Sequence, residues 1–140
     1  MTQPATAKEA KPERAAHAIG LEPAAGRVRA VFGGETVADS ARAIVMLETG
    51  HAPVHYFPRE DVRMDLMRRT RHRTHCPFKG DASYWTIAVG GRTSENAAWS
   101  YEDPPPGIAT VKGYLAFYRD RVDSWREERG AGRPGREPIA

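Results

Sequence analysis

Cysteine, long apolar runs and terminal aromatic residues are absent or nearly absent from this sequence. Cys76 is the single cysteine among 140 residues, so no disulfide can form within the chain, and such cysteine usage is typical of a reducing compartment. No run of roughly eighteen apolar residues occurs, which argues against a membrane-spanning helix and a membrane partner. The first thirty residues contain no continuous apolar stretch, so we expect no secretory signal and a cytoplasmic location.

The absence of aromatic residues from both ends predicts how the chain is divided. All of them lie between Phe32 and Trp125. Residues 1–25 are rich in Ala, Pro, Lys and Glu, which predicts a flexible N-terminal arm, and residues 127–140 mix both charges with Gly and Pro, which predicts a disordered tail. Residues 26–126 are long enough for one small hydrophobic core, and we expect a single β domain there.

Two similar stretches suggest an internal repeat. VRAVFGGETVAD is followed later by VHYFPREDV, and WTIAVGGRTSEN is followed later by YLAFYRDRVDSW. Each Gly-Gly pair suits a tight hairpin, and each later stretch reads as a strand running into a one-turn corner. The predicted fold class is therefore mainly β, with two small antiparallel sheets packed as a β-tent or sandwich and short helical turns. Because Gly-Gly pairs and aromatic strand ends are common, chance similarity stays the alternative.

Positive charge is concentrated in residues 59–79, which carry seven basic and three acidic side chains, whereas the whole chain has a net charge of +3. Such a segment attracts phosphates, carboxylates or nucleic acid, or is simply a solvated charged loop. An interaction module for nucleic acid or an acidic protein is one alternative function. It is disfavoured because the segment lacks the interleaved aromatic residues that stack on bases.

The segment HRTHCPFKG, residues 72–80, is the densest in reactive groups. Metal binding is disfavoured because His72 and Cys76 stand about 13 Å apart in an extended strand, while His75 faces the other way. We therefore predict no metal site and no cofactor. Catalysis is a second interpretation, in which Cys76 is the nucleophile and His75 its base, as in a Cys-dependent transferase or hydrolase. The alternative is that Cys76 is a small buried apolar residue.

A ligand-binding turn is the third interpretation of this segment. Residues 77–80 form a tight turn that presents Lys79, backed by Arg73, and such a turn holds a phosphate or carboxylate through its N–H groups and the ammonium. The motif is not a phosphate-binding P-loop, which needs two glycines and a Lys-Ser/Thr pair. A plain hairpin turn with an exposed lysine is the alternative.

Aromatic side chains predict the rest of the site. Strand alternation places Tyr84 opposite the core face of its strand, and Trp99 and Tyr101 share a face of the next strand. With Tyr114 they predict an aromatic-walled pocket, although ordinary core packing is the alternative for each. Our leading hypothesis is a small-molecule-binding domain whose anionic or polar ligand lies between residues 76–80 and this wall. Glu48, which ends an apolar run, is expected to form a structural ion pair with Arg29 or Arg42.

The stretch 27–125 resembles a bacterial family described as domain of unknown function 427. The pieces that carry the resemblance are VFGGETVADS, HYFPREDV, HCPFKGDASYW, AAWSYEDP and GYLAFYRDRVD. The resemblance implies a β-tent (Mss4-like) fold, other examples of which hold zinc with two CxxC pairs or use a Cys or an aromatic cage for substrates. The family is sometimes labelled nucleotidyltransferase-like, but this sequence has neither those Cys pairs nor a Gly-Ser with paired acids for catalytic magnesium. Whether it is an enzyme, which ligand it binds and whether it forms a homodimer stay open.

Overall fold

The computed structural model describes residues 17–129, which are almost entirely β-strands joined by turns. The mainly β class with small antiparallel sheets and short helical turns is confirmed. Residues 1–16 of the predicted arm and 130–140 of the predicted tail lie outside the described residues. In the part of the chain that is described, no helix has the length and apolar character that crossing a membrane requires.

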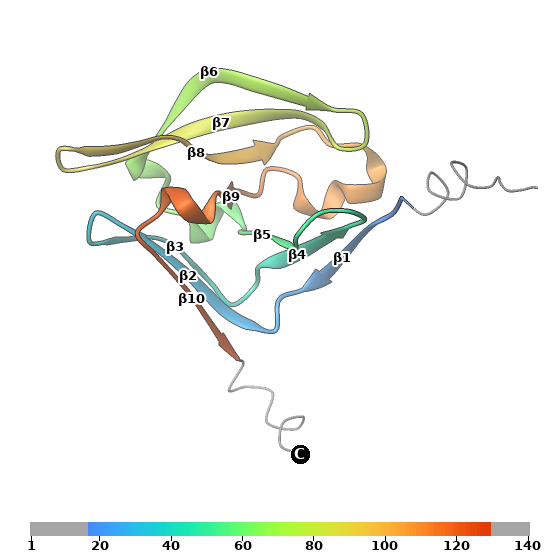
Figure 1. Cartoon of the computed structure of the whole chain (residues 1–140), viewed down its shortest axis with the longest axis horizontal. Helices are drawn as coiled ribbons and strands as arrows, with labels where there is room; N and C mark the ends of the chain where they lie inside the picture. The colour runs from blue at the N-terminus through green and yellow to red at the C-terminus, as the bar shows by residue number, and fades with distance from the viewer. Residues whose placement is uncertain (1–16, 130–140) are drawn as a thin grey trace, which may run out of the picture.

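The strands form three antiparallel sheets rather than the two that we predicted, with a long sheet above two shorter, mutually inclined ones (Figure 1). The four-stranded sheet has the order β6-β7-β8-β9, from Met67–Cys76, Gly80–Val89, Arg92–Tyr101 and Ala116–Phe117. The second sheet has the order β10-β2-β3, from Ser124–Arg129, Gly26–Phe32 and Glu35–Ser40. The third has the order β1-β4-β5, from Ile19–Pro23, Ile44–Glu48 and Val54–Tyr56.

The edge strand β1 of the third sheet lies inside the segment that we expected to be a flexible arm. Ile19 pairs with Glu48 and Pro23 with Ile44, so β1 covers one edge of β4. Ile19 and Leu21 pack against the hydrophobic cluster beneath this sheet, which offsets the entropy lost on ordering the strand. Residues of β4 and β5 pack in the same cluster against residues of β7 and β8.

The internal repeat is visible in the structure as two similar units. Each has a Gly-Gly hairpin, β2–β3 with φ values of 61° and 82° at Gly33 and Gly34, and β7–β8 with 59° at Gly90. Each also has an aromatic strand end followed by a 3₁₀ turn, Arg59–Asp61 (η2) or Arg119–Arg121 (η5). The strand after each turn crosses to the other unit, since β6 pairs with β7 and β10 pairs with β2. The two units are therefore interlocked.

Two hydrophobic clusters fill the space between the sheets. The first contains Phe57, which is fully buried and whose N–H and C=O both bond to Leu115, at 2.8 and 2.9 Å. The second lies between β4–β5 and β7–β8 and includes Met46, Tyr56 and Tyr84. It is rich in tyrosine, and its polar hydroxyl groups border a cavity.

Candidate functional site

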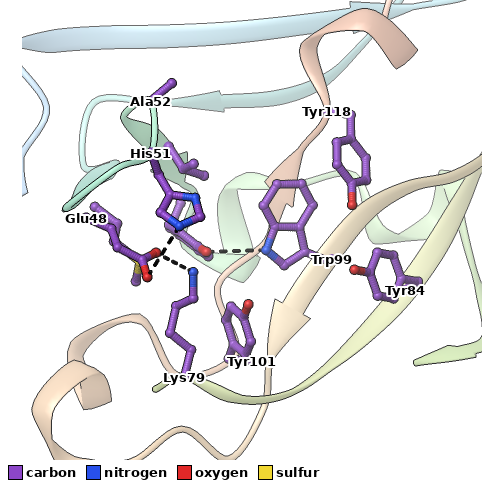
Figure 2. Close-up of a pocket in the computed structure, with 11 residues that line it drawn as sticks. Glu48, His51, Ala52, Lys79, Tyr84, Trp99, Tyr101 and Tyr118 are labelled. Atoms are coloured by element: carbon purple, nitrogen blue, oxygen red, sulfur yellow. Dashed lines mark hydrogen bonds and ion pairs between the residues drawn. The ribbon is translucent and has the colours of Figure 1, made fainter. Parts of the chain in front are cut away.

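A cavity of about 190 Å³ lies between β4–β5 on one side and β7–β8 on the other. Five of its lining residues are aromatic, and we call the cavity the aromatic pocket (Figure 2). Those five are Tyr56, Tyr84, Trp99, Tyr101 and Tyr118. Its remaining lining residues are Met46, Glu48, His51, Ala52, Val54 and Lys79. Aromatic walls with a few polar groups are typical of small-molecule sites.

Strand register places the aromatic rings around the cavity. Tyr84 on β7 lies opposite Trp99 on β8, and Ala82 lies opposite Tyr101. From the facing strand, Tyr56 approaches Trp99 edge-on with ring centroids 6.3 Å apart, and Trp99 Nε1 donates a hydrogen bond to the Tyr56 hydroxyl at 3.3 Å. Burial raises the pKa of both Tyr56 and Tyr101, so their hydroxyl groups stay neutral and able to donate.

A buried ion pair forms the polar end of the pocket. Lys79 Nζ lies 2.6 Å from Glu48 Oε1, and the two side chains are only 14% and 7% exposed. His17 Nε2 is 3.1 Å and His51 Nε2 3.8 Å from the other oxygen of Glu48. Burial by itself raises the pKa of Glu48, but hydrogen bonds with Lys79 and His17 outweigh burial and hold it below its ordinary value. Glu48 is therefore ionised at neutral pH.

The expected partner of Glu48 was wrong. Arg29 bonds to Asp39, and Arg42 bonds to Glu60 and Asp61, all on or near the second sheet. Glu48 lies instead at the end of β4, which pairs with β1 and β5 and faces the turn after β6. Alternation along a single strand does not show which turn the strand will face. The sequence therefore could not identify Lys79 as the ion-pair partner of Glu48.

The turn between β6 and β7 directs Lys79 into the pocket. Cys76 and Gly80 are the last paired residues of the hairpin, Gly80 has a φ of 92°, and the Lys79 N–H donates to Cys76 O at 3.2 Å. The Lys79 ammonium lies 5.9 Å from the centre of the Tyr101 ring. Four of the predicted ligand-binding residues, Lys79, Tyr84, Trp99 and Tyr101, thus line one cavity.

The other candidate residues lie elsewhere. Arg73 and His75 are exposed on β6 and pair with Asp81, at 3.6 and 2.7 Å. Cys76 is partly buried and is not a lining residue. Tyr114 is also partly buried, packs against the second cluster and does not line the pocket. The proposed pairing of Cys76 with His75 as nucleophile and base stays a prediction.

Sequence patterns missed Tyr56, Tyr118 and His51 as lining residues. Tyr56 ends a three-residue strand, Tyr118 follows the two-residue strand β9, and His51 lies in the loop after β4. Their positions around the cavity depend on β5 lying beside β9 and on the Phe57–Leu115 bridge. Such long-range pairing leaves no signal in a single sequence.

Comparison with known families identifies the chain. The model of a family described as Domain of unknown function (DUF427) matches residues 20–128. The chain belongs to the DUF427 family. The matched residues run from β1 to β10 and contain every residue that lines the aromatic pocket. No curated protein matches the chain.

A second set of polar contacts surrounds Tyr84 in this DUF427 domain. Its hydroxyl lies 3.0 Å from Thr74 Oγ1, and its ring centroid lies 4.4 Å from that of His72. Figure 2 shows the Tyr84 and Tyr118 side chains pointing toward each other. Burial, with a hydrogen bond to Tyr84, raises the pKa of Tyr118 to about 12. The side of the pocket opposite Glu48 therefore also carries hydroxyl groups, which can donate and accept hydrogen bonds.

The described residues hold no group of three or more His, Cys, Asp or Glu side chains arranged to bind a metal ion. His51 and His17 instead meet Glu48, and His75 meets Asp81. The residues that line the aromatic pocket offer hydrogen bonds, ring contacts and the Glu48–Lys79 ion pair.

Proposed function

We propose that this DUF427 domain binds a small polar molecule in the aromatic pocket, through a ligand group that both donates and accepts hydrogen bonds. The observation that carries the proposal is the buried Glu48–Lys79 ion pair at the end of an aromatic-walled cavity. The carboxylate accepts from a ligand N–H or O–H, and the ammonium donates to a ligand oxygen. The surrounding rings cover the flat faces of the ligand.

The charge balance favours a neutral polar ligand over an anion. Lys79 is already neutralised by Glu48 at 2.6 Å, so an anionic ligand has to approach a mostly buried carboxylate. Repulsion between like charges is strong there, because the effective dielectric constant is low. An amide or a similar group meets both partners without this penalty.

The ion pair itself supports a role beyond folding. Burying two charges costs desolvation energy that their attraction often only just repays, so a well-packed apolar pair would stabilise the fold as well or better. Here the pair also lines a cavity, so the part of each side chain that faces the cavity makes no packing contact within the fold. A binding role explains why both charges occupy this position.

Benzamide, which has a neutral ring and an amide group, tests the proposal. We expect benzamide to bind the wild-type domain and the Trp99→Ala variant to bind it at least tenfold more weakly, measured by isothermal titration calorimetry at neutral pH. This substitution removes the indole ring that contacts the ligand and the hydrogen bond that the indole donates to the Tyr56 hydroxyl. Tyr118→Ala, at a residue that is 38% exposed, gives a second test if Trp99→Ala folds poorly.

The matched control is Leu47→Ala. Leu47 is a large apolar residue of β4 that is 40% exposed and does not line the pocket. Its substitution should leave benzamide affinity unchanged. Equal affinities of wild type, Trp99→Ala and Tyr118→Ala would refute the proposed site.

A further inference from the structure

A second, larger cavity of about 650 Å³ adjoins the aromatic pocket. The two cavities share the lining residues His51, Ala52, Val54, Trp99 and Tyr118. The second cavity continues beyond them to Pro53, His55, Phe117, Arg119, Trp125 and Glu127. Trp99 and Tyr118, whose ring centroids lie 4.6 Å apart, lie where the two cavities adjoin.

The sizes of the two cavities suggest a divided ligand. Small-molecule sites usually have a volume of roughly 300–1,000 Å³, and the aromatic pocket, at about 190 Å³, is smaller than this range. It has room for a compact polar group. The adjoining cavity falls within the range, so a ligand that extends past Trp99 and Tyr118 from one cavity into the other has room there for its larger part.

The second cavity has charged groups but little net charge. Arg119 Nη2 bonds to Glu127 Oε2 at 2.5 Å, and Trp125 Nε1 donates to the same oxygen at 2.7 Å. Burial lowers the pKa of His55, so its imidazole is neutral at neutral pH. An uncharged ligand group is therefore the best match, and the rings of Trp125 and Phe117 favour one that is planar.

His55 adds a polar feature to this cavity. Its side chain is 10% exposed and lies edge-on to Trp125, with centroids 5.6 Å apart. Its Nδ1 is buried and has no hydrogen-bond partner among residues 17–129. Buried polar atoms are nearly always paired, so a ligand atom in this cavity that meets the His55 ring after a small rotation would supply the missing partner.

We propose that the second cavity is a subsite for an uncharged planar ring, and that this ring belongs to the same ligand whose polar group lies in the aromatic pocket. The inference rests on the proposed function for the polar half of that ligand. It adds the substrate class, which is an elongated molecule with a polar amide-like end and a flat uncharged end.

The indole N–H signals of the three tryptophans provide the test, because the three residues differ in which cavities they line. Trp125 lines the second cavity alone, Trp99 lines both cavities, and Trp85 lines neither and is 4% exposed. The ¹H–¹⁵N signals of their indole N–H groups are followed while the wild-type protein is titrated with indole-3-propanamide, which joins a planar ring to an amide. Indole and propanamide are titrated separately for comparison.

We expect indole-3-propanamide to move the Trp99 and Trp125 signals together, to leave Trp85 unchanged, and to bind at least tenfold more tightly than either fragment. Trp125→Leu should remove that gain, whereas Arg126→Ala, at the next and exposed residue of β10, should retain it. Movement of Trp99 alone would overturn the subsite and leave the proposed function standing. Movement of Trp125 alone would overturn the joined ligand and count against the proposed function, and movement of neither signal would overturn both.

Discussion

Glu48→Gln is expected to change the charge preference of the aromatic pocket. The substitution keeps the shape of the side chain but removes the negative charge that lies 2.6 Å from Lys79. The freed ammonium then attracts an anion in a poorly hydrated site. Benzoate, which has nearly the shape of benzamide, should bind the variant about tenfold more tightly than wild type, equivalent to about 1.4 kcal/mol.

Calorimetric titrations of both proteins with benzamide and benzoate measure this change. Glu22→Gln is the matched control, since Glu22 is exposed on β1 and does not line the pocket. It should leave both affinities as in wild type. If Glu48→Gln bound benzoate no better than wild type does, Lys79 would have no part in ligand binding.

The same substitution should also lower the free energy of unfolding by about 3 kcal/mol near neutral pH, because it leaves a mostly buried ammonium without its partner. The pKa of Glu48 is lowered in the folded state, so its contribution is present above the unfolded value of about 4.3 and disappears as the pH falls through the folded value. The stability difference between wild type and variant should therefore shrink below about pH 4 in urea titrations.

Phe57→Ala is expected to destabilise the domain by about 3–5 kcal/mol. Phe57 is fully buried, and its ring centroid lies 5.7 Å from that of Phe117 and 5.8 Å from that of Trp125. It thus contacts residues of the second repeat unit. A cavity at this point loosens the packing that holds β5, and with it Tyr56, beside the aromatic pocket.

Urea denaturation, followed by tryptophan fluorescence, measures the change in unfolding free energy. Leu47→Ala removes a large apolar side chain from an exposed position and should change the stability by no more than about 0.5 kcal/mol. A loss below about 1 kcal/mol for Phe57→Ala would show that the two units do not depend on this contact.

Local patterns predicted the parts of the site that lie close together in the sequence. The Cys76–Gly80 hairpin follows from Pro77 and Gly80, and the direction of Tyr84, Trp99 and Tyr101 follows from strand alternation. These residues do line one pocket. Each prediction required only the geometry of one strand or one turn.

Contacts between distant segments could not be predicted in this way. Glu48 and Lys79 are 31 positions apart, and their meeting depends on the end of β4 facing the turn between β6 and β7. The alternation of Ile19 and Leu21 was the available signal for β1, but it was too short to distinguish a strand from an arm rich in Ala and Pro. The third sheet and the pocket positions of Tyr56 and Tyr118 were also missed, because they depend on pairing between distant segments.

A crystal structure of the wild-type domain with benzamide would show directly whether the aromatic pocket binds a polar ligand. We expect the ring between Tyr101 and Trp99, with the amide oxygen within hydrogen-bond distance of Lys79 Nζ and the amide N–H directed at Glu48. A structure in which benzamide binds outside the aromatic pocket, or turns its amide away from the Glu48–Lys79 pair, would contradict this expectation.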